Sequence, residues 1–195
     1  MAQDLAALSA LSIRSAFDQS FASLRVLLDK GHIQSFLVVL YSTIDAAAWL
    51  SVEHGGDVTK KDFVRWVDEY LLPQSGLDCS ALDLYAARCG VLHSFSAYSA
   101  LQRKGKARPI SYALGSGSLP ALRRLIAVSD EKEAVAVQLE DLANAVVRGW
   151  ERFHASIESN PRTLQRLTVR GGMLFSLVGQ TAGTPHPAAI RPANG

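Results

Sequence analysis

Hydrophobic positions recur at helical spacing over the first part of the chain. Between Leu8 and Leu28 the apolar residues are mostly three or four apart, and this spacing predicts an amphipathic helix that ends near Gly31. Residues Ile33 to Val52 follow at once as a second helical segment, with apolar side chains on almost every face. Because a helix that is apolar all round is normally buried, we predict that this second helix lies inside a bundle.

Two further helices are predicted to begin at a hydroxyl residue that has an aspartate three positions later. Thr59 with Asp62, and Ser80 with Asp83, have the spacing of helix N-terminal caps. The helix after Thr59 has an apolar stripe and ends before Pro73. The helix after Ser80 has so little polar face that we predict it either at the centre of the bundle or in a subunit interface.

The second half of the chain alternates short elements with longer ones. Ile110 to Leu114 and Val135 to Leu139 read as short strands, and we expect them to pair as a small β-hairpin. A short helix is predicted over Leu119 to Ile126, and another from Leu142 through Phe153. Pro161, at the first position after a capping asparagine, predicts a last helix that runs to about residue 178.

The fold class follows from these elements and from the composition. With 195 residues, of which 48% are hydrophobic and 19% charged, the chain suits a single globular domain of mainly α class. We predict one helical-bundle domain over residues 1–179 and a flexible C-terminal tail over residues 180–195, which is rich in Gly, Pro, Thr and Ala. The net charge of +2 is small, so any basic surface must be local.

Cysteine use and hydropathy indicate the compartment. Cys79 and Cys89 belong to no metal-ligand cluster, and we expect two reduced thiols in a cytoplasmic protein. The first residues lack the basic and apolar regions of a secretory signal. Ile33 to Leu50 has nearly the length of a membrane span, but Asp45 near its middle would add about 2.5–3.5 kcal/mol to insertion. We therefore expect no membrane association.

Two apolar stretches carry a single charged side chain each. Asp45 is the only charged residue from Ile33 to Val52, and Arg88 is the only one between Asp83 and Arg103, with His93 five positions after it. Burying an unpaired ion costs several kcal/mol, so these residues need an explanation. Either Asp45 and Arg88 neutralise each other inside the core, or Arg88 and His93 face a functional site that Asp45 supports. The sequence leaves both readings open.

The segment from Tyr85 to Phe95, with Arg88 and His93 in it, resembles the Arg-x4-6-His motif of the HEPN superfamily. The order of helices before it, with an acid alone on the second, is also similar, and the resemblance covers roughly residues 33 to 114. About one such spacing is expected by chance in a chain of this composition. The other two occurrences lie on ordinary amphipathic helices: Arg25 with His32, and Arg148 with His154.

This resemblance implies a HEPN-like bundle and a metal-independent endoribonuclease of toxin or defence type, without a cofactor. His93 would take or return the proton of the ribose 2′-hydroxyl, and Arg88 would stabilise charge on the phosphate, so that cleaved RNA carries cyclic-phosphate ends. The family pattern further implies a homodimer with a composite cleft, an RNA or nucleotide ligand, and an antitoxin protein as a partner. The alternative is a catalytically inactive HEPN-like module that binds a nucleotide or a partner protein and acts as a dimeric scaffold.

Two neighbours of the motif depart from the family pattern. Cys89 stands where HEPN ribonucleases usually have Asn, Asp or His, and Phe95 stands where toxins regulated by nucleotidyl transfer have Tyr. On an ideal helix Arg88 and His93 are about 140° apart, which would not aim both at one phosphate. We therefore expect either Gly90 to loosen the turn or a second subunit to complete the site.

Basic residues are candidates for RNA contact at two places. One is a loop that contains Arg103, Lys104, Lys106 and Arg108, and the other is a face of the last helix with Arg162, Arg166 and Arg170. Neither place has interleaved aromatic residues, so a solvated face is the alternative. Gly115-Ser-Gly-Ser precedes a helix but lacks the lysine of a phosphate-binding loop, and we interpret it as a turn.

Overall fold

A computed structural model of the chain describes residues 2–52, 56–96, 98–130, 133–158, 167 and 169–170. The predicted tail over residues 180–195 lies outside these ranges, as do Arg162, Arg166 and most of the predicted last helix. In chain order the elements are α1 (Ala2–Asp29), α2 (Ile33–Ser51), α3 (Lys60–Trp66), the π-helix η1 (Val67–Leu71), α4 (Ala81–Ser94), α5 (Ala100–Arg103), β1 (Ile110–Ala113), α6 (Ser118–Val128), β2 (Val135–Gln138) and α7 (Leu139–Glu158). The prediction of a mainly α-helical fold is confirmed.

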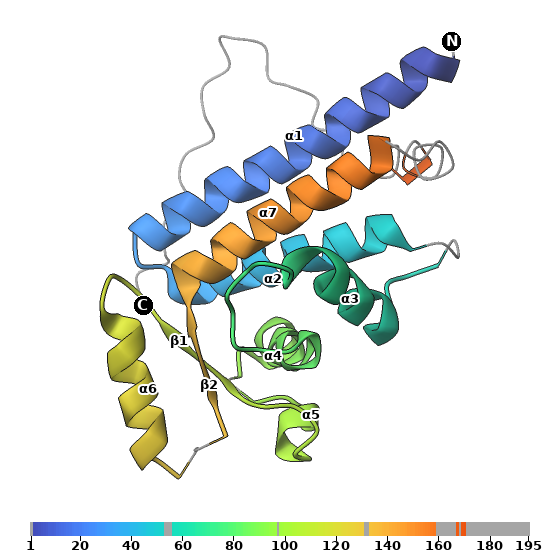
Figure 1. The fold of residues 1–195 in the computed structure, drawn as a ribbon. Coiled ribbons are helices and arrows are strands. Elements are labelled where there is room, and N and C mark those ends of the chain that lie inside the picture. The colour runs from blue at the N-terminus through green and yellow to red at the C-terminus, as the bar shows by residue number, and fades with distance from the viewer. Residues whose placement is uncertain are drawn as a thin grey trace, which may run out of the picture.

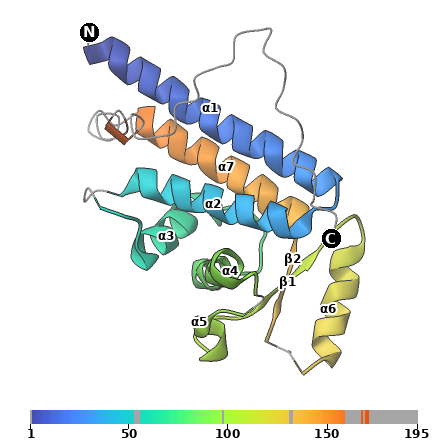
Figure 2. The same cartoon turned by 180° about the vertical axis from the view of Figure 1, so that it is seen from behind.

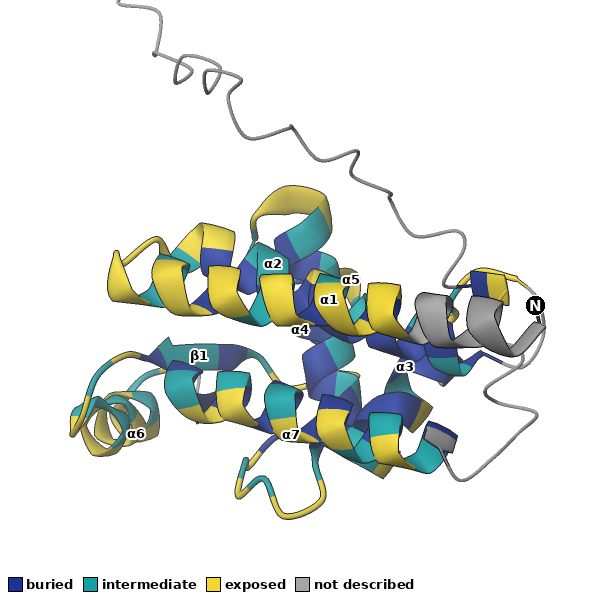
Figure 3. Ribbon diagram, turned by 90° about the horizontal axis from the view of Figure 1, so that it is seen from above, coloured by how far each residue is buried: buried dark blue, intermediate teal, exposed yellow. Residues whose placement is uncertain are grey.

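The helix α2 occupies the centre of the bundle, as its apolar surface predicts. It packs against α1, α3, α4 and α7. In Figures 1 and 2, α1 and α7 run side by side, and α4 lies across the other side of α2. Seen from above, α1 turns a largely exposed face outward (Figure 3), and its inner face includes Phe17, whose ring stacks on Trp150 of α7 at 3.6 Å between centroids.

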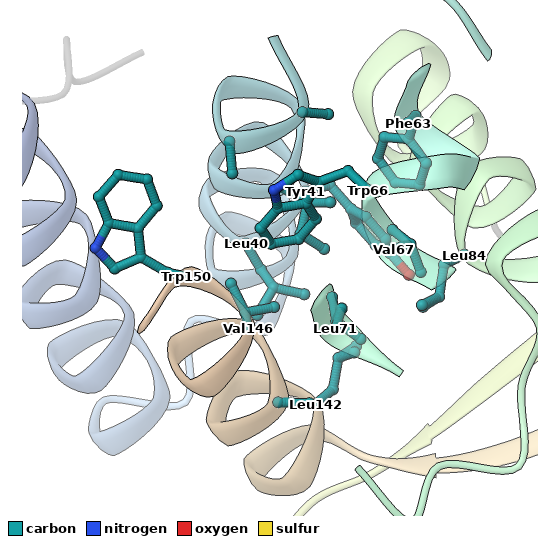
Figure 4. Close-up of a cluster of buried hydrophobic side chains, with 14 of the residues drawn as sticks. Leu40, Tyr41, Phe63, Trp66, Val67, Leu71, Leu84, Leu142, Val146 and Trp150 are labelled. Atoms are coloured by element: carbon teal, nitrogen blue, oxygen red, sulfur yellow. The ribbon is translucent and has the colours of Figure 1, made fainter. Parts of the chain in front are cut away.

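The core is built mainly from aromatic and leucine side chains of α2, α3, η1, α4 and α7. Trp66, Tyr41 and Phe63 are 0% exposed, and Figure 4 shows these rings with Leu71, Leu84 and Leu142 around them. Fully burying a side chain of this size contributes about 1.5–3 kcal/mol. The predicted apolar stripe after Thr59 therefore supplies the middle of the core.

The end of α3 continues as a π-helix, which the sequence did not predict. Arg152 of α7 donates to the backbone oxygen of Tyr70, from Nε at 2.8 Å and from Nη2 at 2.5 Å. Gly149 lets α7 approach closely, because a Cβ there would lie 3.1 Å from the Cα of Leu71 and from the oxygen of Tyr70. A π-turn leaves backbone groups without their usual helical partners, and α7 satisfies one of them here.

The two predicted strands pair, but they do not form a hairpin. β1 and β2 are parallel, with Ile110 opposite Val135 and Ala113 opposite Gln138. The prediction of a hairpin was wrong because α6 carries the chain back to the end where β1 began, and a crossover of that kind gives parallel strands. The Gly115 turn before α6 is held by Glu140, whose carboxylate accepts from the Gly115 amide at 2.8 Å.

Among the described residues, α2 is the one helix long and apolar enough to cross a membrane, with a mean hydropathy of 1.4. This result rests on length and composition alone, and the core helix of a bundle passes the same test. Half of the stretch is buried inside the fold. Its central position explains its apolar surface without a membrane.

Both predicted capping patterns are present, and the second one also anchors β1. Asp83 caps the start of α4 by accepting from the Ser80 amide at 2.9 Å. The same carboxylate accepts from the backbone amide of Arg108 at 2.7 Å and from its Nε at 3.0 Å. Because Asp83 is buried, it fixes the start of α4 against the segment that leads into β1.

We expect Asp83→Asn to lower the free energy of unfolding at neutral pH by about 1–3 kcal/mol, because bonds to a charged carboxylate are weakened. Although burial raises the pKa of Asp83, bonds from Ser80 and Arg108 lower it below the ordinary value of 3.8. The contribution of Asp83 is therefore complete above about pH 4 and is lost as the pH falls through its lowered pKa. In denaturant titrations, the stability difference between the two proteins should shrink below about pH 4.

Asp68→Asn is the matched control, because Asp68 is exposed on η1. Its stability should differ from that of the unchanged protein by less than about 0.5 kcal/mol at every pH. A difference between the unchanged protein and Asp83→Asn that widens in acid would contradict the assignment of Asp83 as a carboxylate clamp.

Candidate functional site

Arg88 of α4 and Asp45 of α2 form an ion pair across the two helices. Nε of Arg88 donates to Oδ2 of Asp45 at 2.7 Å, and Nη2 donates to the same oxygen at 2.5 Å. The side chains are 19% and 17% exposed, respectively, so the pair is partly buried but not sealed. The two isolated charges that the sequence singles out therefore do meet, as one of the two readings proposed.

The remaining edge of the Arg88 guanidinium contacts His93. Nη1 of Arg88 lies 3.2 Å from Nε2 of His93, and His93 is exposed. The two side chains meet although α4 stays α-helical from Ala81 to Ser94. The two side chains touch despite the angle of about 140° between their positions, because five residues rise only about 7.5 Å along the axis and the arginine side chain is long enough to cover that distance. Arg88 therefore contacts Asp45 and His93 at the same time, and a functional site at these residues stays a prediction.

Gly90 has a different role from the one the sequence suggested. It does not loosen α4; instead, the chain after the helix folds back across it. The Ser96 amide donates to the Gly90 oxygen at 3.1 Å, and a Cβ on residue 90 would lie only 2.5 Å from the backbone oxygen of Ser96. Only glycine fits this crossing, which sets where His93 and Phe95 lie.

Phe95 ends α4 in the left-handed backbone region, with φ of 48° and ψ of 29°. Its side chain is 71% exposed. Glycine or asparagine is the usual residue at such a position, because a Cβ is unfavourable there. The conformation caps α4, because the Phe95 amide donates to the Val91 oxygen at 3.3 Å, but neither this cap nor packing explains a large exposed aromatic residue here.

Cys89 and Tyr85 complete the surroundings of Arg88. Interactions with the Cys89 thiol contribute to the raised pKa values of both Tyr85 and Arg88. The ring of Tyr85 rests against Phe63 with its edge, at 5.4 Å between centroids. Sequence analysis missed Tyr85 as a site residue, although its spacing of three and four residues from Arg88 and Cys89 places all three on one face of α4.

Burial and charge act against each other at the ion pair. Burial raises the pKa of Asp45, and bonds and charge from Arg88, with the charge of His93, offset only part of this. Burial lowers the pKa of Arg88, but the bonds and charge of Asp45 outweigh it and raise that pKa above its ordinary value. Burial, with the neighbouring Cys89, raises the pKa of Tyr85. Arg88 therefore stays cationic, and Tyr85 stays protonated, at neutral pH.

The four basic residues predicted to contact RNA lie near one another but differ in how they are held. Arg108 is bound to Asp83 and donates from Nη2 to the Asp78 oxygen at 3.0 Å. Arg103, at the end of α5, donates to the Tyr98 oxygen at 3.0 Å. Lys104 and Lys106 are exposed between them. The loop thus has two anchored arginines and two exposed lysines, and its contact with RNA stays a prediction.

Within the ranges that the structure describes, no group of three or more His, Cys, Asp and Glu residues is placed to hold a metal ion. Comparisons with protein-family models, with curated proteins and with solved structures gave no match for this chain. The resemblance to the HEPN superfamily therefore stays a prediction that rests on the motif residues. The site itself offers a cation that Asp45 holds in place and an exposed imidazole in contact with it, which is a pairing suited to acid–base chemistry at a phosphate.

We expect Gly90→Ala to destabilise the protein by about 1–3 kcal/mol, because the added methyl group overlaps a backbone atom that cannot move alone. In an ordinary helix interior the same change would stabilise by about 1 kcal/mol. Thermal unfolding measures the sign, and amide chemical shifts of residues 94–99 should report the displaced crossing.

Gly149→Ala serves as a graded comparison, since its Cβ would meet backbone atoms at 3.1 Å rather than at 2.5 Å. It should destabilise less than Gly90→Ala and leave the shifts of residues 94–99 unchanged. A Gly90→Ala protein that is more stable than the unchanged one would refute the crossing at residue 90.

Proposed function

We propose that this chain is a HEPN-like endoribonuclease of toxin or defence type that cleaves RNA without a metal ion, with Arg88 and His93 as its catalytic residues. The observation that carries the proposal is the 3.2 Å contact between Nη1 of Arg88 and Nε2 of His93. A cation and an imidazole at this distance fit around a single phosphate and its neighbouring ribose hydroxyl. The exposure of His93 and the partial exposure of Arg88 allow RNA to reach them.

Arginine has donors only, so Nε2 of His93 is the acceptor in its contact with Nη1 of Arg88. When a phosphate takes the place of this contact, Nε2 is free to receive the proton of the ribose 2′-hydroxyl. The 2′-oxygen then bonds to phosphorus, the bond from phosphorus to the 5′-oxygen breaks, and a proton is returned to that 5′-oxygen. The products are a 2′,3′-cyclic phosphate and a 5′-hydroxyl.

Asp45 is a positioning residue in this proposal. It binds the Nε and Nη2 edge of Arg88, so that the Nη1 edge faces His93 and an incoming phosphate. A guanidinium held at two of its nitrogens loses little further freedom when it binds the phosphate. Cys89 helps to raise the pKa of Arg88, which gives it a supporting role.

A homodimer through the outer face of α4 would supply a second acid–base pair. Leu82, Tyr85, Cys89 and Leu92 are all only partly buried, and they lie along one side of α4. One imidazole must both take and return the proton, whereas two copies of the site would divide these tasks. In this proposal the exposed Lys104 and Lys106 contact the RNA backbone. An antitoxin protein would cover the site. The free thiols of Cys79 and Cys89 suit a protein of the cytoplasm.

We expect Arg88→Ala and His93→Ala each to lower the rate of RNA cleavage by about 10²–10⁴-fold, because general acid–base and charge stabilisation contribute on that order. Cleavage by the unchanged protein should persist in the presence of a chelator and should leave 2′,3′-cyclic phosphate ends. End-group analysis of a labelled oligonucleotide measures both. A requirement for magnesium would rule out this mechanism.

The chain contains a matched control pair. Arg25 and His32 have the same residue types and a similar spacing, but both are exposed on or beside α1. Arg25→Ala and His32→Ala should cleave RNA at the unchanged rate. Equal losses from both pairs of variants would show that the effect is one of general charge and not of the Arg88 site.

The second candidate is a catalytically inactive HEPN-like module that binds a nucleotide or a partner protein. The two bonds from Arg88 to Oδ2 of Asp45 favour it, because such a pair has a sufficient structural role by itself. Removing one partner of a buried pair costs about 3–5 kcal/mol, and removing both costs less. If Arg88→Ala unfolds the protein, Arg88→Ala with Asp45→Ala restores the fold, and His93→Ala changes nothing, this second function is the correct one.

We expect the protein to run as a dimer in light scattering coupled to gel filtration. Leu92→Glu places a charge on the partly buried face of α4 and should shift the mass to that of a monomer, about 21 kDa. Leu125→Glu is the control, because Leu125 is 65% exposed on α6, away from that face. A monomer at all concentrations for the unchanged protein would contradict the composite cleft.

A further inference from the structure

A pocket lies between α2, α4 and β1. Its volume is about 200 Å³, and its walls are Leu37, Ala87, Val91, Ile110, the Tyr112 ring and Phe95, with Gln34 and Ser96 as the polar members. Pockets for drug-sized ligands measure roughly 300–1,000 Å³, so this one suits a single flat ring system and not a whole nucleotide. α4 contributes to both this pocket and the Arg88 site, because Ala87 precedes Arg88 directly.

The polar groups of the pocket are not equally available. The Tyr112 hydroxyl lies 2.5 Å from the Tyr41 hydroxyl, and the Ser96 hydroxyl donates to the Tyr98 oxygen at 3.1 Å. These contacts commit both groups to the protein and leave the Tyr112 ring as an apolar wall. Gln34 is exposed on the first turn of α2, and its amide has two donors and an acceptor. An amide of this kind matches the edge of a nucleobase.

Phe95 gives the pocket an exposed aromatic wall at a cost to the fold. It adopts the left-handed conformation with φ of 48° and is 71% exposed, so neither backbone preference nor burial explains the residue. Residues in such conformations cluster at ligand sites, where the surrounding structure holds them. An exposed aromatic ring held at this place can stack on a base.

We propose that this pocket binds the base of the nucleotide whose phosphate contacts Arg88 and His93, with Phe95 as the stacking surface and the Gln34 amide at the edge of the base. The inference rests on the proposed function and adds a nucleobase subsite to it. Phe95 is two residues from His93, so their Cα atoms are at most about 7 Å apart, which is a separation that one nucleotide spans. The pocket is otherwise apolar, and Ala87 in its wall is next to Arg88 in the sequence, an arrangement that matches a base joined to a phosphate.

The test compares a ligand that has a base with one that does not. We would measure the binding of 3′-nucleoside monophosphates and of inorganic phosphate by calorimetry, for the unchanged protein and for Phe95→Asn. Loss of the ring should weaken nucleotide binding by about 5- to 150-fold and leave phosphate binding unchanged. Because asparagine tolerates the left-handed conformation, the variant should unfold at the same temperature as the unchanged protein or at a higher one. Gln34→Ala should alter the preference among the four bases.

Leu125→Asn is the control for loss of an exposed apolar side chain, and it should leave both affinities unchanged. If Phe95→Asn and Gln34→Ala bind nucleotides as tightly as the unchanged protein, while Arg88→Ala weakens both ligands, the base pocket is overturned and the proposed function stands. If Phe95→Asn weakens nucleotides while Arg88→Ala alters neither ligand, the base pocket stands and the proposed role of Arg88 fails. If the unchanged protein binds neither ligand, both proposals are overturned.

Discussion

Arg88 and Asp45 meet where two apolar helices cross, and each removes the cost of burying the other. A lone carboxylate on α2 or a lone guanidinium on α4 would oppose the packing of the bundle. Together they join the two helices through one carboxylate oxygen, at 2.7 Å and 2.5 Å. The position of α4 relative to the central helix depends on this pair. The orientation of Nη1, the atom of Arg88 that faces His93, depends on this pair as well.

The ends of α4 are fixed by two other constraints, one polar and one steric. At its start, the Asp83 carboxylate joins the helix cap to the segment before β1. Near its end, Gly90 lets the following residues cross the helix, which places His93 and Phe95. The ion pair lies between these constraints. As a result, the helix that carries the candidate chemistry is held at its start, middle and end.

The same residues can serve the fold and the chemistry because the ion pair is incomplete. Asp45 occupies two nitrogens of the guanidinium, and the third is turned to an exposed imidazole. A fully enclosed pair would stabilise the bundle equally well but would offer nothing to a ligand. Phe95, by contrast, adds little to the stability of the fold: its left-handed backbone conformation is unfavourable, and its exposed ring buries little apolar surface. Both departures from the best packing adjoin His93, because Arg88 contacts it and Phe95 is two residues from it.

The sequence by itself determined the mainly helical class, the approximate positions of α1, α2, α3, α4, α6 and α7, and the two capping pairs, because these depend on local spacing and on neighbouring residues. It also identified Asp45, Arg88 and His93, since an isolated charge in an apolar stretch is visible without coordinates. The parallel pairing of the strands, the π-helix and the contact between Arg88 and His93 were decided only by the tertiary structure. Each depends on the return path of the chain or on the reach of a long side chain, and spacing along one helix contains neither. Tyr85 and Gly90 likewise take on their roles only when α4 is packed against its neighbours.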